Sequence, residues 1–133
     1  MPILTGIALA CLTACTSSQD VSVETVARSF YRAFADGDGA RACRLLSAST
    51  RSEVEKSAEA PCAEGLLDED LPEVTDVEDV RVYGVMAQVR FAGAGGSPET
   101  AFLSRYDEGW RVTASGCTGT GASTPYDCQV SGG

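Results

Sequence analysis

The 133-residue chain contains no histidine, and lysine supplies only one of its ten basic residues. The absence of histidine removes the commonest general base and the commonest metal ligand. Because 19 acidic residues leave a net charge of −9, the chain also lacks the lysine and arginine side chains that neutralise nucleic-acid phosphates. Phosphate-binding loops and dinucleotide fingerprints are missing as well. We therefore expect no nucleic-acid partner, no cofactor and no metal.

Long hydrophobic runs are also missing. The longest, Ile3–Ala14, has twelve uncharged residues, which is too short to span a bilayer but typical of a signal-peptide core. It ends in LTAC at positions 12–15, which resembles the lipobox of bacterial lipoproteins. Cys11 lies in a similar frame but lacks the large aliphatic residue three places before it.

From this segment we expect a signal peptide over residues 1–14, a lipid on Cys15 and a polar tether over 15–20, followed by a single domain over 21–133. The lipid would attach the protein to the outer face of the bacterial cytoplasmic membrane, in the cell envelope. A plain signal peptide cut after a small residue, and a buried N-terminal segment, are the alternatives.

Four cysteines remain for the expected domain, an even number in a chain bound for an oxidising compartment. They allow three pairings. We favour the local one, Cys43–Cys62 with Cys117–Cys128, which closes a short loop in each half of the domain. A metal site is disfavoured because no CxxC spacing is present.

Apolar residues recur at helical spacing in the first half of the chain. The expected segments are a helix capped by Ser22 and ending at Asp36, one capped by Asp38, one over Arg51–Ala58 after a capping box at Thr50, and a helical turn over Cys62–Leu67.

From Val74 onward the apolar period changes to two. This predicts one hairpin around Gly84 and a second around residues 107–109, with a turn over 92–97. A loop over 116–124 and a short edge strand over 126–130 follow. The fold class is therefore α+β, with the N-terminal helices packed on a curved antiparallel sheet and two disulfides.

Two segments and the cysteines carry a resemblance to a known superfamily. FYRAFADGDGARACRLL at 30–46 and GWRV at 109–112 resemble the nuclear transport factor 2-like superfamily, and more narrowly the small bacterial lipoproteins that contain such a domain. The resemblance implies a cone-shaped barrel whose sheet wraps the first helix and leaves a pocket, and domains that often form homodimers through the outer sheet face. The pocket residues we expect are Tyr31, Phe34, Tyr83, Phe102 and Trp110.

The superfamily includes isomerases, dehydratases and ligand-binding proteins, so the fold does not choose a function. An enzyme of this kind needs a buried acid or base, and no carboxylate is expected in the apolar phase of a strand. We therefore expect a non-enzymatic module that binds a small ligand or an envelope protein. A pocket enzyme of the isomerase or dehydratase type, and a structural interaction module, are the alternatives.

Charged residues offer two further candidates. Residues 53–79 hold eleven acids and one base, but the D-x-D-x-D-G pattern of a calcium loop is missing, so we interpret them as a solvated acidic surface. Four arginines on predicted strands would form an anion site if they shared one face with Tyr83 and Tyr106; otherwise they solvate the outer side of the sheet. They are Arg81, Arg90, Arg105 and Arg111.

Overall fold

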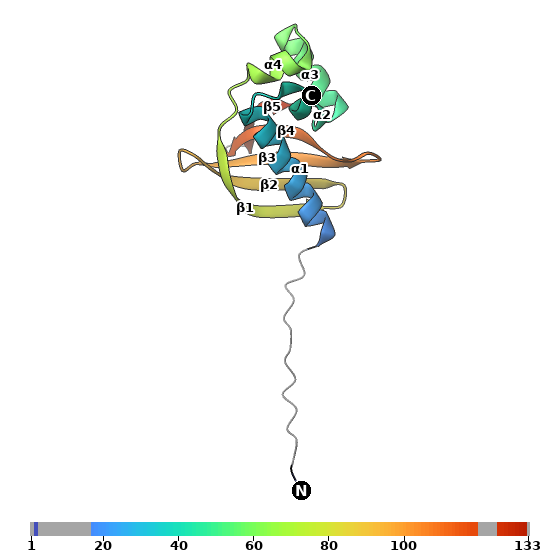
Figure 1. The fold of residues 1–133 in the computed structure, drawn as a ribbon, viewed down its shortest axis with the longest axis vertical. Helices are drawn as coiled ribbons and strands as arrows, with labels where there is room; N and C mark the ends of the chain where they lie inside the picture. Colours follow the sequence, from blue (N-terminus) through green and yellow to red (C-terminus); the bar gives the residue numbers. More distant parts are fainter. Residues whose placement is uncertain (1, 3–16, 120–124, 133) are drawn as a thin grey trace.

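The computed structural model describes residues 2, 17–119 and 125–132. Its helices are α1 (Ser18–Ala35), α2 (Gly39–Arg44), α3 (Ala48–Ala58) and α4 (Cys62–Leu67). Its strands are β1 (Val74–Tyr83), β2 (Met86–Gly93), β3 (Pro98–Tyr106), β4 (Gly109–Gly119) and β5 (Tyr126–Ser131). The strands pair antiparallel in chain order, and α1 crosses one face of the sheet while α2, α3 and α4 gather beyond its β5 edge (Figure 1).

This architecture confirms the predicted α+β class, with N-terminal helices on a five-stranded antiparallel sheet. The sheet is open, because β1 and β5 form its two edges and do not pair with each other. The strands therefore do not close into a barrel, which is where the structure differs from the cone-shaped barrel implied by the family resemblance. Helix α1 covers one face of this meander, and none of the helices in residues 17–119 and 125–132 lies on the other face (Figure 1).

Two of the predicted helix starts are wrong. The N-cap of α1 is Ser17, whose Oγ accepts a hydrogen bond from the Asp20 amide at 3.1 Å. The cap is therefore five residues earlier than the predicted cap at Ser22. Ser47 rather than Thr50 caps α3, accepting from the Thr50 amide at 3.3 Å. The predicted cap of α2 by Asp38 is confirmed.

The strand predictions hold, except that β4 continues to Gly119 where a loop was expected from Gly116. In this strand Cys117 pairs with Thr100, but Ala114 pairs with Phe102, so β4 carries an extra residue there. Such bulges bend a strand and increase its twist. Gly116, in the bulged region, has a φ of +62°, a conformation that glycine adopts without steric cost.

The core lies between α1 and the sheet. Val23, Ala27 and Phe30 are fully buried along one stripe of α1 and belong to the same cluster as Val89 and Leu103 of the sheet. The helical spacing seen in the sequence is therefore the spacing of the buried face. Each such valine, leucine or phenylalanine stabilises the fold by about 1.5–3 kcal/mol when it is buried.

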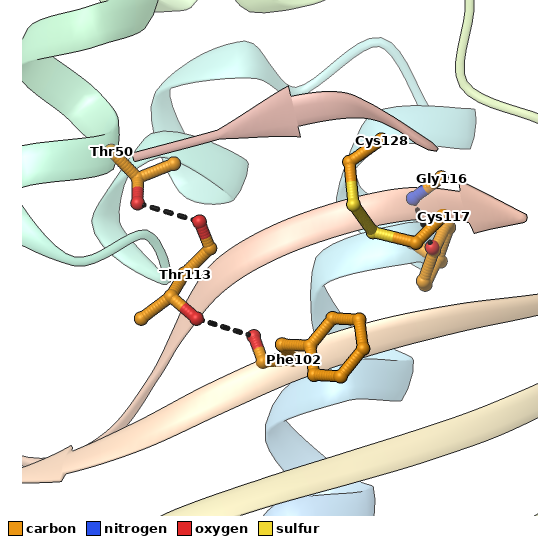
Figure 2. Close-up of a disulfide and its surroundings, with 7 residues drawn as sticks. Thr50, Phe102, Thr113, Gly116, Cys117 and Cys128 are labelled. Carbon is orange, nitrogen blue, oxygen red and sulfur yellow. Dashed lines mark hydrogen bonds between the residues drawn. A yellow bond between two sulfur atoms is a disulfide. The ribbon is translucent and has the colours of Figure 1, made fainter. Parts of the chain in front are cut away.

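Backbone bonds connect the helical half to the sheet. The segment between α2 and α3 pairs with β4, because the Ser47 amide donates to the Val112 carbonyl at 2.9 Å and the Val112 amide donates to the Leu45 carbonyl at 2.8 Å. Nearby, the Thr50 hydroxyl donates to the Thr113 carbonyl at 2.8 Å (Figure 2). These bonds hold α3 against β4.

Both predicted disulfides are present. Cys43–Cys62 joins α2 to α4, and Cys117–Cys128 joins the neighbouring strands β4 and β5 (Figure 2). Two disulfides indicate an oxidising, extracytoplasmic location. Among the helices of the described residues, none has the length and apolar character needed to cross a membrane.

Candidate functional site

The five aromatic residues expected to line a pocket do not share one. Tyr31 and Trp110 are buried in the core, and Phe34 packs against the edge of that core. Phe102 alternates with the buried residues of β3 and lies on the opposite face of the sheet. Tyr83 is 60% exposed beside the β1–β2 turn. The structure thus divides them between the core, the outer face and the surface.

The four strand arginines are also separated. Arg81 and Arg90 lie on the outer face, in ion pairs with acidic residues of β1 at 2.7 and 3.1 Å. Arg105 extends toward the start of α1, where one of its Nη atoms donates to the Gln19 side chain at 3.4 Å. Arg111 lies in a different cleft, which it shares with arginines from the helices. The four do not form one anion site.

That cleft has a volume of about 450 Å³ and lies between the α2–α3 segment and the β3–β4 hairpin. Its polar lining consists of Arg44, Ser47, Arg51, Tyr106, Glu108 and Arg111. We call it the basic cleft. Its size is within the range of about 300–1,000 Å³ that is usual for small-molecule sites.

The pairing of the α2–α3 segment with β4 builds the basic cleft. Because Leu46 bridges to Val112, Arg44 and Arg51, on either side of Leu46 in the chain, line the same cleft as Arg111. Arg111 is fixed in turn by a bond from its Nη1 to the Trp110 carbonyl at 2.8 Å. Nothing in the local sequence pattern reveals this arrangement, which depends on a contact across 66 residues.

The three arginines of the basic cleft retain most of their hydrogen-bonding capacity. Arg51 lies 3.7 Å from Glu55 in an exposed ion pair, and within the part of the chain that the structure describes Arg44 forms no salt bridge. Glu108 is the one acidic residue in the lining. Guanidinium groups match the planar geometry of carboxylates and phosphates, so the cleft is suited to an anion.

A second polar site surrounds Glu99, which lies on β3 in the same phase as Ala101 and Leu103. Glu99 is 9% exposed, and its Oε2 atom is buried without a hydrogen-bond partner among the described residues. Burial raises the pKa of its carboxyl group. The expectation that no carboxylate occupies an apolar strand phase is therefore wrong, and the alternation of Glu99 with Ala101 and Leu103 was the signal that could have revealed it.

Tyr31 lies near this carboxyl group. Its hydroxyl oxygen accepts a hydrogen bond from the Gly116 amide at 3.0 Å. Burial raises the pKa of Tyr31 to about 12, against the lowering effect of the Gly116 bond, and the charge of Glu99 adds to the increase. The phenol therefore stays protonated at physiological pH. Glu99 and Gly116 also line a cleft of about 220 Å³ together with Asp70.

In residues 17–119 and 125–132, no three histidine, cysteine, aspartate or glutamate side chains come together as a metal site. Cys15, the expected lipidation site, lies outside the described residues. No protein-family model, curated protein or solved structure matches the chain. The nuclear transport factor 2-like resemblance therefore stays a prediction, and function has to be argued from the two sites.

Proposed function

We propose that the protein is a lipid-anchored protein of the bacterial envelope whose domain binds a small anionic ligand in the basic cleft. The LTAC segment at 12–15 supports the anchor at Cys15, and the two disulfides agree with an extracytoplasmic location. The observation that carries the ligand proposal is the convergence of Arg44, Arg51 and Arg111 on one cleft in a chain of net charge −9.

The cleft holds its ligand from three directions. Arg111 comes from a central strand, while Arg44 and Arg51 come from the end of α2 and the first half of α3. The amino end of α3 at Ser47 also lines the cleft, and its partial positive charge favours an anion. Glu108 repels negative charge on its side, so the preferred ligand carries its carboxylate or phosphate group at one end.

Calorimetric titration with inorganic phosphate and with citrate tests the proposal. We expect the variant Arg111→Gln to weaken binding of the anion that binds best by about tenfold, because a hydrogen bond to a charged group contributes about 1.5–3 kcal/mol. Arg90→Gln is the matched control, since it removes the same charge from a strand arginine outside the cleft. Equal affinities of the two variants, or no binding of either anion by the unmodified protein, would refute the proposal.

One observation favours a second candidate, a pocket enzyme of the isomerase or dehydratase type. A buried carboxyl group with a raised pKa, such as that of Glu99, is the usual form of a general acid or base. Such a base exchanges the protons next to a carbonyl group. Incubating the protein with small cyclic ketones in heavy water, followed by NMR, detects that exchange. The enzyme candidate requires exchange that Glu99→Gln abolishes, and it fails if the variant and the unmodified protein behave alike.

A further inference from the structure

Large apolar side chains are exposed mainly at one end of the domain. Among the described residues seven such side chains are exposed; four of them lie where the β1–β2 and β3–β4 hairpins turn, and a fifth lies in the first turn of α1. These five, which we call the turn-end surface, are Val21 (53% exposed), Tyr83 (60%), Val85 (54%), Met86 (60%) and Tyr106 (43%). A gathering of this kind on a small domain marks an interaction surface.

Contacts place the two hairpin turns and the start of α1 at the same end of the domain. Across the hairpins, the Arg105 amide donates to the Val85 carbonyl at 2.8 Å, which places the β1–β2 turn beside the end of β3. The same arginine reaches the Gln19 side chain at the start of α1. Val21 follows Asp20 in the first turn of α1. It lines a shallow cleft together with residues of the β3–β4 turn. The surface therefore spans both turns and the beginning of α1.

The proposed anchor leaves the domain at this same end. Figure 1 shows α1 starting beside the β1–β2 turn, and the N-cap of α1 is Ser17. Only Thr16 separates Ser17 from Cys15. Because a residue spans at most about 3.6 Å, a lipidated Cys15 would lie within about 7 Å of the helix cap. A domain held that closely cannot turn its anchored end away from the bilayer.

We propose that the turn-end surface rests in the interfacial region of the lipid bilayer, with Tyr83, Val85 and Met86 in contact with the lipids. This inference rests on the proposed anchor at Cys15. Tyrosine suits such a position, because its ring is apolar and its hydroxyl stays in water. The attraction is hydrophobic rather than electrostatic, since Asp107 and Glu108 lie in the β3–β4 turn and the chain as a whole is acidic. The membrane that fits is zwitterionic, and contact with it is insensitive to salt.

Quenching of tryptophan fluorescence by brominated lipid tests this arrangement. All helices, strands and core residues of the described structure lie within residues 18–131, so residues 15–133 contain the whole domain. With both disulfides formed, Cys15 is the only free thiol in that chain, and maleimide coupling attaches one phospholipid to it. The orientation is then measured whether or not a cell lipidates Cys15, so failure of the anchor proposal and failure of this inference are distinguishable.

The reporters are Tyr83→Trp and a matched control, Tyr126→Trp. Both replace an exposed tyrosine, but Tyr126 pairs with Gly119 at the far end of β4, roughly 25 Å along the bulged strand from the turn at Gly109. In vesicles of dibrominated phosphatidylcholine, we expect the added tryptophan at 83 to be quenched at least about threefold more than that at 126, at low and high salt alike. Native Trp110 contributes the same background to both.

Equal quenching of the two reporters would overturn the proposal, because the domain would then have no preferred face toward the bilayer. An unquenched reporter at 83 would also overturn it and would assign the turn-end surface to a protein partner. Strong quenching at 83 that disappears in high salt would contradict the hydrophobic mechanism. A second test uses Val85→Trp as the reporter and combines it with Tyr83→Ser and Met86→Ser, which replace only exposed side chains. These two serines should lower the quenching of the tryptophan at 85 toward the value measured at 126.

Discussion

Replacing Glu99 by glutamine removes a charge from a place where water reaches it poorly. Glu99 as a whole is 9% exposed, its Oε2 atom is buried without a partner among the described residues, and burial raises the pKa of its carboxyl group. A raised pKa in the folded state means that the folded protein holds this proton at pH values where the unfolded chain has released it. Glu99 therefore makes the protein less stable as the pH increases through the folded-state pKa, whereas most carboxyl groups act in the opposite direction.

The size of the effect follows from the missing partner. A buried polar group left without a hydrogen bond costs about 1–3 kcal/mol, and more when it is charged. Glutamine keeps the shape and removes the charge, although its amide still needs partners. We therefore expect Glu99→Gln to stabilise the protein by about 1 kcal/mol at about pH 7, which corresponds to an increase in Tm of about 4 °C for a domain of this size. Below the pKa of the unfolded glutamate this gain should disappear, because the carboxyl group is then protonated in both the folded and the unfolded state.

Differential scanning calorimetry between about pH 4 and pH 8 measures this difference. The control is Glu73→Gln, which changes the net charge equally but at an exposed position. Only the Glu99 variant should gain stability relative to the unmodified protein as the pH rises. If Glu99→Gln is less stable at neutral pH, or if the control gains as much, the carboxylate is not a buried charge in solution and the argument from its missing partner fails.

Three further outcomes are expected. Replacing the Cys43–Cys62 pair, which closes a loop of 19 residues, by alanines should lower the free energy of unfolding in urea by about 3 kcal/mol, and a loss below about 1 kcal/mol would contradict the loop-entropy estimate. Tyr31→Phe leaves the Gly116 amide without its acceptor and should cost about 1–2 kcal/mol while accelerating hydrogen exchange at that amide; unchanged exchange would refute the bond. Cys15→Ser should release the protein from the membrane fraction into the medium of a lipoprotein-processing host, and full retention would refute the anchor.

Much of the fold could be predicted from the local spacing of apolar residues in the sequence. The apolar stripe of α1 and the alternation in β2 and β3 correspond to the faces that are buried, and the local disulfide pairing was correct. The starts of α1 and α3 were harder to predict, because the first helical residues after Ser17 and Ser47 include few large apolar side chains. At Thr50 the capping-box pattern matched, but this residue donates to the Thr113 carbonyl of β4, a partner 63 positions away.

The candidate sites were harder to predict for the same reason. The basic cleft exists because Leu46 pairs with Val112, and no periodicity within one segment places Arg44 and Arg51 beside Arg111. The bulges of β4 were equally hidden, since only the register against β3 reveals an extra residue. By contrast, the sequence does show that Glu99 alternates with the apolar residues Ala101 and Leu103. Its burial was missed because glutamate is usually assigned to the solvent face of a strand.

The two disulfides close loops that do not overlap along the chain. Cys43 and Cys62 both precede Cys117 and Cys128, and they are separated by 19 and 11 positions. During export from the amino end, the first pair emerges complete before either cysteine of the second pair is outside. Among these four cysteines, an oxidant that joins thiols in their order of appearance therefore makes the native bonds. With Cys15 carrying its proposed lipid, this order of the four cysteines favours correct oxidation during translocation over the formation of wrong pairs.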